Sequence, residues 1–106
     1  MSVKAHEVET VLWVLFQHLK KLDFSGRVTV DELLAACGPH RESLLYVASM
    51  FTADELLKIT LAVLRRRDLI QWVGMQSALS LPGKREKVLQ EVSRLRDGLL
   101  SLKKVA

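Results

Sequence analysis

Two short runs of basic residues are the part of this 106-residue sequence that could do chemistry. Guanidinium and ammonium groups bind phosphate oxygens, and such contacts supply most of the non-specific affinity of proteins for nucleic acids. The first run lies at the end of one predicted helix, and the second lies at the start of the last predicted helix of the chain. The six side chains are Arg65, Arg66, Arg67, Lys84, Arg85 and Lys87. Three interpretations stay open: a phosphate-binding surface, a surface for an acidic protein, or solvated cations that only complement a helix dipole.

The distribution of charge also places a polyanion-binding surface in the second half of the chain. Residues 52–106 contain eleven basic and six acidic side chains, a balance of +5, whereas residues 1–51 contain five and six, a balance of −1. The whole net charge of +4 therefore belongs to the half that carries both basic runs.

The other residue types that commonly do chemistry are few and scattered. His6, His18 and His40 are far apart, and no Cys/His cluster accompanies them, so we expect no metal site. Cys37 precedes a helix-ending glycine and is predicted to be a small core residue, with a redox switch as the alternative. There is no nucleophile elbow and no glycine-rich phosphate loop. We therefore expect neither an enzyme nor a bound cofactor.

Composition predicts one folded domain spanning residues 1–106. Apolar residues make up 49% of the chain and charged residues 26%, which is enough to bury a core. The longest apolar run, residues 11–16, is far shorter than the roughly 18 residues of a membrane span. With a single cysteine and no signal-peptide pattern, we expect a cytoplasmic protein, associated with the nucleoid if it binds DNA.

Apolar periodicity and capping residues predict four helices in the first two thirds of the chain. Their expected ranges are Lys4 to Leu22 (an N-terminal segment of residues 1–22), Val30 to Cys37, Arg41 to Met50 and Ala53 to Arg67. Thr29 with Glu32, and Thr52 with Glu55, have the spacing of capping boxes that begin the second and fourth helices. A short extended piece is expected over residues 27–29.

A β-hairpin and a long helix are predicted for the remainder. Residues 69–73 and 76–81 are β-prone, and Gly74-Met75 suits the centre of a type II′ turn. Pro82 ends the second strand, and the last helix is expected over residues 83–104. The expected fold class is therefore mainly α with a small β-hairpin.

The order of these elements resembles the winged helix-turn-helix superfamily. The matching segments are Arg27-Val28-Thr29-Val30-Asp31-Glu32-Leu33, Leu61-Ala62-Val63-Leu64-Arg65-Arg66-Arg67-Asp68-Leu69-Ile70, and Leu79-Ser80-Leu81-Pro82-Gly83-Lys84-Arg85. The resemblance implies a winged-helix core over residues 27–82, with Ala53 to Arg67 as the recognition helix and the hairpin as the wing. It also implies that Lys58, Thr60 and Ala62 lie nearest to base edges.

Two features depart from that family pattern. Residues 41–50 are either an inserted short helix or, in another register, the helix that supports the recognition helix. The recognition-like helix begins with Asp54 and Glu55, which DNA phosphates would repel, and residues 69–83 carry no charge.

Trp72 and Met75 of the predicted hairpin have two interpretations. In the first, both side chains are exposed and contact a protein partner. In the second, Trp72 packs on a neighbouring helix of the same chain.

Two copies of the chain are predicted to form a homodimer through a heptad-like seam in the last helix. The apolar far face of the first helix is expected to add to this interface. The predicted interface residues are Trp13, Val88, Val92, Leu95, Leu99 and Leu102. The alternative is that the seam packs only on the first helix of its own chain.

The sequence thus favours a small dimeric winged-helix protein that binds double-stranded DNA, either a transcriptional regulator or a chromosome- or plasmid-associated factor. The alternative is a winged-helix module for protein–protein interaction within a larger assembly.

Overall fold

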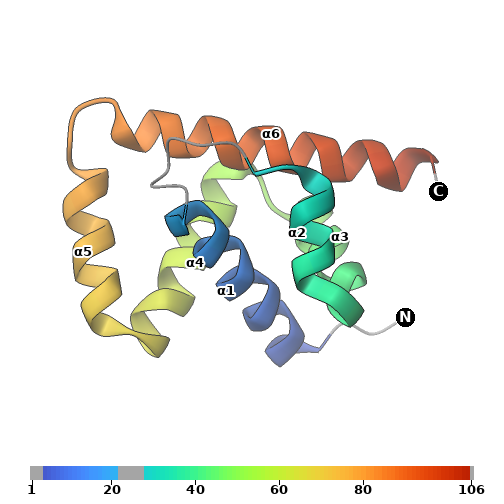
Figure 1. The fold of residues 1–106 in the computed structure, drawn as a ribbon, viewed down its shortest axis with the longest axis horizontal. Helices are drawn as coiled ribbons and strands as arrows, with labels where there is room; N and C mark the ends of the chain where they lie inside the picture. The colour runs from blue at the N-terminus through green and yellow to red at the C-terminus, as the bar shows by residue number, and fades with distance from the viewer. Residues whose placement is uncertain (1–3, 22–27, 106) are drawn as a thin grey trace.

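The structure is a computed structural model that describes residues 4–21 and 28–105. Over these ranges the chain is helical, with one 3₁₀ turn and no strand. The elements are α1 (Ala5–Lys21), α2 (Val30–Cys37), η1 (Gly38–His40), α3 (Arg41–Met50), α4 (Ala53–Arg67), α5 (Leu69–Leu79) and α6 (Lys84–Val105). The long α6 lies along one side of the molecule, and α5 forms one end of it (Figure 1).

The predicted bounds of α2, α3 and α4 are confirmed, and side-chain caps mark the starts of α2 and α4. Thr52 and Glu55 form the expected capping box at the start of α4, with each side chain accepting a hydrogen bond from the other residue's backbone N–H. The Thr29 side chain likewise accepts the N–H of Glu32 at the start of α2. Gly38, with φ of 54°, ends α2 in a backbone conformation that L side chains rarely adopt.

The predicted β-hairpin, and with it the mainly-α-plus-hairpin winged-helix fold class, is wrong. Residues 69–79 form the single helix α5, and Gly74 lies within it rather than in a turn. Asp68 caps this helix by accepting the backbone N–H of Gln71 at 3.1 Å. Its apolar residues Met75 and Leu79 are buried four positions apart, which is helical rather than strand spacing.

The extended piece predicted for residues 27–29 is also not a strand where the structure describes it. Val28 is buried and Thr29 caps α2, while Arg27 lies outside the described residues. At the end of α1, Leu22 is likewise outside them.

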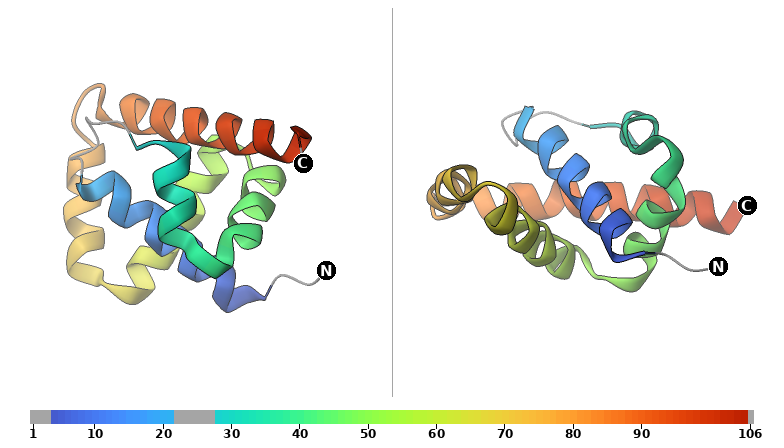
Figure 2. Two further views of the ribbon diagram at one scale, coloured as in Figure 1. Left: turned by 45° about the vertical axis from the view of Figure 1, so that its right-hand side comes forward. Right: turned by 90° about the horizontal axis from the view of Figure 1, so that it is seen from below.

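The core joins one face of each α-helix into a single cluster. The α1–α4 pair makes the most extensive packing, followed by α3–α6 and α4–α5. Figure 2 shows α1 crossing the molecule between α2 on one side and α4 on the other. None of the described helices is both long enough and apolar enough to span a membrane.

The seam of α6 packs inside its own chain, mainly on α3 and α4. Val88, Val92, Leu95 and Leu99 are each at most 3% exposed. These four residues therefore have no surface left for a second copy, and the predicted dimer interface along them is wrong. The alternative, packing on the first helix alone, is also wrong, because α3 and α4 supply most of the surface that covers the seam.

Two arginines and a glycine on the two flanks of the α6 seam contact or allow close approach of other segments. Arg94 donates to the carbonyl oxygen of Val28 at 2.5 Å, and Arg96 donates to that of Phe51 at 2.7 Å. A Cβ on Gly98 would lie 2.5 Å from Cγ2 of Val30, so the glycine lets α2 approach α6 closely.

Candidate functional site

An open groove of about 1290 Å³ lies on the described surface. We call it the α1–α4–α5 groove, since these helices supply most of its lining. The residues are Ala5, Val8, Glu9 and Leu12 of α1; Lys58, Ile59, Leu61, Ala62, Val63, Arg65 and Arg66 of α4; Trp72 and Gln76 of α5; and Tyr46, Phe51 and Arg85. It exceeds the roughly 300–1,000 Å³ typical of small-molecule pockets.

Helical spacing explains why these side chains meet in one groove. On α4, the residues Lys58, Ile59, Ala62, Arg65 and Arg66 follow the i, i+1, i+4, i+7, i+8 pattern of a single helix face. The residues from α1 recur at three- and four-residue spacing in the same way. The two faces border the same groove because α1 and α4 pack side by side.

The groove combines apolar walls with four cations. Val8 and Ile59 are partly buried in its lining, while Ala62 is exposed on it. The cations are Lys58, Arg65, Arg66 and Arg85. Glu9 is the one carboxylate in the lining, so the groove carries net positive charge.

Two of these arginines are oriented by side chains across the groove. The Arg65 guanidinium lies 5.0 Å from the centroid of the Trp72 ring, a cation–π distance that joins α4 to α5. Arg66 forms an ion pair with Glu9, which joins α4 to α1. Both arginines are exposed. The ion pair between Arg66 and Glu9 therefore contributes little to stability, and Arg66 can exchange Glu9 for another carboxylate.

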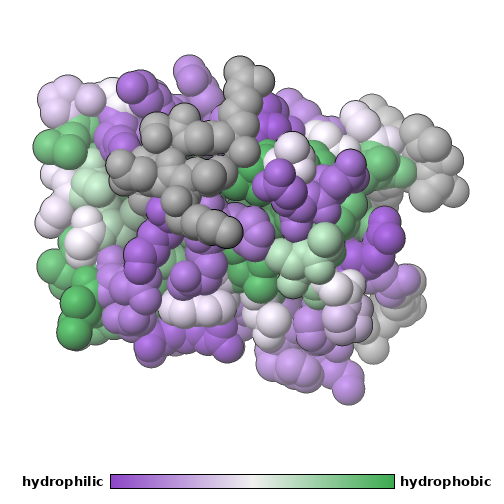
Figure 3. All heavy atoms as spheres, viewed as in Figure 1, coloured by the Kyte–Doolittle hydropathy of each residue, from purple (hydrophilic) through white to green (hydrophobic). Residues whose placement is uncertain are grey.

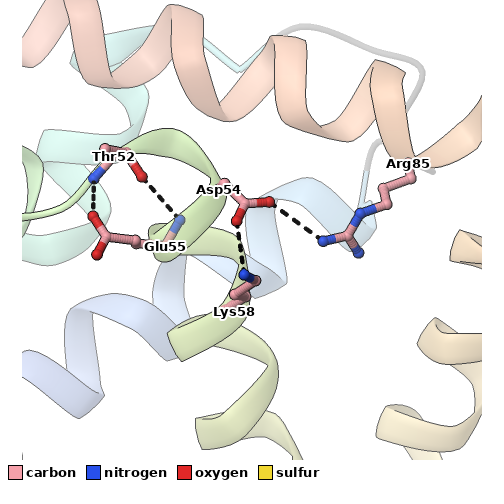
Figure 4. Close-up of polar contacts among 5 residues, drawn as sticks. All are labelled: Thr52, Asp54, Glu55, Lys58 and Arg85. Carbon is pink, nitrogen blue, oxygen red and sulfur yellow. Dashed lines mark hydrogen bonds and ion pairs between the residues drawn. The ribbon is translucent and has the colours of Figure 1, made fainter.

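The other two cations share one carboxylate at the start of α4 (Figure 4). Lys58 lies 3.0 Å and Arg85 3.4 Å from the Asp54 oxygens. The hydrogen bond from Lys58, with the charge of Arg85 added, lowers the pKa of Asp54 below its ordinary value. Asp54 is therefore ionised at neutral pH and reduces the positive charge at this end of the groove.

The structure brings together only part of the two predicted basic runs. Arg65, Arg66 and Arg85 share the groove with Lys58, whereas the Arg67 guanidinium lies 5.2 Å from the Trp13 ring centroid. Lys84 and Lys87 are outside the groove lining, and Lys87 is exposed.

Thr60, expected near base edges, is only 3% exposed. Its Oγ1 atom is buried without a hydrogen-bond partner in the described structure. Thr60 therefore belongs to the core and cannot contact a nucleic acid in this conformation.

The remaining predicted contact residues pack largely within the chain. Met75 is buried and Trp72 is partly buried beneath Arg65, so the packing interpretation holds for this pair. Trp13 is partly buried against Phe16 and Arg67. Leu102, at 40% exposure, is the member of the predicted dimer set that lies on the surface.

Cys37 is buried in the core, as predicted, and its chemistry follows from that position. Burial raises the pKa of the thiol to about 11, so the reactive thiolate is scarce at neutral pH. Among the described residues, no group of three or more His, Cys, Asp or Glu side chains is placed to hold a metal ion.

The groove itself was not predicted, although the sequence contained part of its signal. Val8, Glu9 and Leu12 lie at helical spacing on one side of the first helix, and Lys58 and Ala62 do so on the fourth. Such spacing defines a face but not its neighbour, so the groove became visible only when α1, α4 and α5 were placed together.

Comparisons with known proteins add no relative: no family model, curated protein or solved structure matches this chain.

Proposed function

We propose that this protein is a helical protein-interaction module whose α1–α4–α5 groove binds an acidic, amphipathic helix of a partner protein. The observation that carries the proposal is the lining of the groove, where apolar side chains lie among four cations. An amphipathic helix inserts its apolar face into such a groove and places flanking carboxylates beside the cations. The volume and openness of the groove suit a peptide better than a small molecule.

Arg66 supports this proposal because its present partner can be exchanged. Glu9 offers a carboxylate from α1, and a carboxylate from an incoming helix would substitute for it. Arg65 supports it in another way, since the exposed guanidinium on the Trp72 ring is held in one position before binding. Such preorganisation lowers the entropic cost of recognition.

The test uses two designed peptides of about 18 residues, five turns of helix. Both carry leucine at i, i+3, i+4 and i+7, and they differ only in having glutamate or lysine beside the leucine stripe. We expect the glutamate peptide to shift the amide resonances of groove residues in ¹⁵N-labelled protein, and the lysine peptide to bind at least ten times more weakly. Equal binding of the two peptides, or no binding at about 1 mM, contradicts the proposal.

Two variants localise the binding. Ala62→Trp adds a bulky side chain at an exposed position of the groove lining, and Arg65→Glu reverses a groove charge. The matched control is Lys87→Glu, which makes the same charge change at an exposed cation outside the groove lining. We expect both groove variants to weaken the glutamate peptide at least tenfold and the control to change its affinity less than twofold.

Double-stranded DNA is the second candidate partner, favoured by the balance of +5 in residues 52–106. Here the basic side chains would contact phosphates without reading base edges, so affinity should fall steeply with salt. The same variants separate the candidates. DNA binding through phosphates should weaken to a similar degree in Arg65→Glu and Lys87→Glu, whereas groove binding is sensitive only to the former. A duplex that causes no salt-sensitive shift in mobility removes this candidate.

We also propose that the chain self-associates. Since the α6 seam is buried, this association needs another surface.

A further inference from the structure

The outer face of α5 is an apolar surface that the rest of the chain leaves uncovered. Ile70 is 85% exposed, and Leu69 and Val73 are each more than half exposed. These residues lie on the side of α5 opposite the buried Met75 and Leu79. Figure 3 shows hydrophobic residues along the edge of the molecule that α5 forms in Figure 1.

Charge is absent from this face. Residues 69–83 contain no Asp, Glu, Lys or Arg, although the chain as a whole carries +4. The cations around this face are engaged by other groups: Arg65 and Arg67 lie over the Trp72 and Trp13 rings, and Arg66 pairs with Glu9. Lys20 donates to the side-chain oxygen of Gln71 at the border of the face. The face therefore offers no complement to a nucleic acid or to an acidic peptide, and it lets two positively charged copies meet without like charges in the contact.

Gly74 adds a local feature that suits a close helix–helix contact. It lies in the middle of α5, it is exposed, and a Cβ built on it would touch nothing within 4 Å. A glycine at such a position weakens a helix relative to alanine, and within one chain nothing requires it. Its bare backbone lets a second helix approach more closely than any side chain would.

We propose that the outer face of α5, formed by Leu69, Ile70, Val73 and Gly74, binds the same face of a second copy of this chain. The inference rests on the self-association proposed above. Ile70 and Gly74 point away from the groove, whereas the groove residue Gln76 borders the face beside Leu69 and Val73. An eleven-residue helix is about 16 Å long and 10 Å wide, so its face is much smaller than the roughly 800 Å² per partner of a stable interface. The dimer is accordingly weak and reversible.

Sedimentation equilibrium of the full chain from about 1 μM to about 1 mM tests the proposal. The average mass should rise with concentration from 12.0 kDa toward twice that value. Gly74→Lys and Ile70→Lys each place a charge on the face and should raise the dissociation constant at least tenfold. Gly74→Lys is the sharper variant, because lysine fits the open space and favours the helix, so circular dichroism should show an unchanged fold.

The matched control is Met50→Lys, since Met50 on α3 is 58% exposed, the same fraction as Leu69. This variant should leave the dissociation constant within twofold of the unmodified chain. A chain that stays at 12.0 kDa throughout overturns both self-association and the assigned face. A dimer that survives both α5 variants, or that Met50→Lys weakens equally, overturns the assigned face alone.

Cross-linking gives a positive readout. Gly74→Cys should form disulfide-linked dimers under air oxidation much faster than Met50→Cys does. The native Cys37 stays in place in both variants, because it is buried and its thiolate is scarce. Equal rates for the two variants contradict the proposal.

Discussion

Gly98 provides a quantitative test of how α2 packs on α6. Replacing an exposed helical glycine by alanine normally stabilises a helix by about 0.8–1.0 kcal/mol. Here, however, the new Cβ would lie 2.5 Å from Cγ2 of Val30, which is much closer than a normal contact. Overpacking of this kind costs about 1–3 kcal/mol. We therefore expect Gly98→Ala to lower the free energy of unfolding by about 1 kcal/mol once both effects are added.

A double-mutant cycle with Val30 separates the two effects. Val30→Ala alone should cost about 1 kcal/mol, because the half-buried side chain loses its packing. In the double variant the added Cβ occupies space that Val30 has left, so the gain in helix propensity appears without the clash. The double variant should then match the unmodified chain, giving a coupling energy of about 2 kcal/mol.

Urea denaturation followed by circular dichroism at 222 nm measures all four proteins. The reasoning is refuted if Gly98→Ala raises stability by about the same amount in both backgrounds, since helix propensity alone would then explain it.

Three further predictions follow from buried or capping groups. Thr60→Val should raise the free energy of unfolding by about 1 kcal/mol, because it removes an unpaired buried hydroxyl; Thr10→Val, which loses the 2.8 Å hydrogen bond to the carbonyl oxygen of His6, should bring no gain. Labelling of Cys37 by a disulfide reagent should be at least about 100-fold slower in the folded than in the urea-unfolded chain, since its pKa rises from 9.0 to about 11; equal rates would mean an accessible thiol. Hydrogen bonds from the backbone and side chain of Thr52 lower the pKa of Glu55, so the ionised carboxylate stabilises the folded chain. This contribution to the free energy of unfolding is complete above about pH 4.5 and is lost as the pH falls through the lowered pKa. Urea midpoints measured down to pH 2 should therefore decline less steeply in Glu55→Gln, which has no carboxyl group to titrate.

Local signals in the sequence were sufficient for most helices but not for α5. The capping pairs at Thr29 and Thr52 act over three residues, so they fixed the starts of α2 and α4 without knowledge of the fold. The same signal was present at the start of α5, where Asp68 is followed three residues later by Gln71. This spacing alone does not decide the element, because a short apolar run next to a glycine is also typical of a hairpin.

The apolar seam of α6 illustrates a different limit. Its spacing correctly defines a face that must be buried, but not whether the covering surface belongs to the same chain or to another. The crossing of α3 and α4 beneath α6 decides this, and it depends on contacts between residues far apart in sequence.

The sequence by itself determined the caps, most helix bounds, the burial of Cys37 and the balance of charge, because each depends on residue type or on neighbours within one turn. The tertiary structure alone decided which cations act together. It gathered Lys58, Arg65, Arg66 and Arg85 in one groove, turned Arg67 toward Trp13, and buried Thr60. It also left the outer face of α5 uncovered at the end of the molecule, since whether an apolar face is buried depends on which helix packs against it.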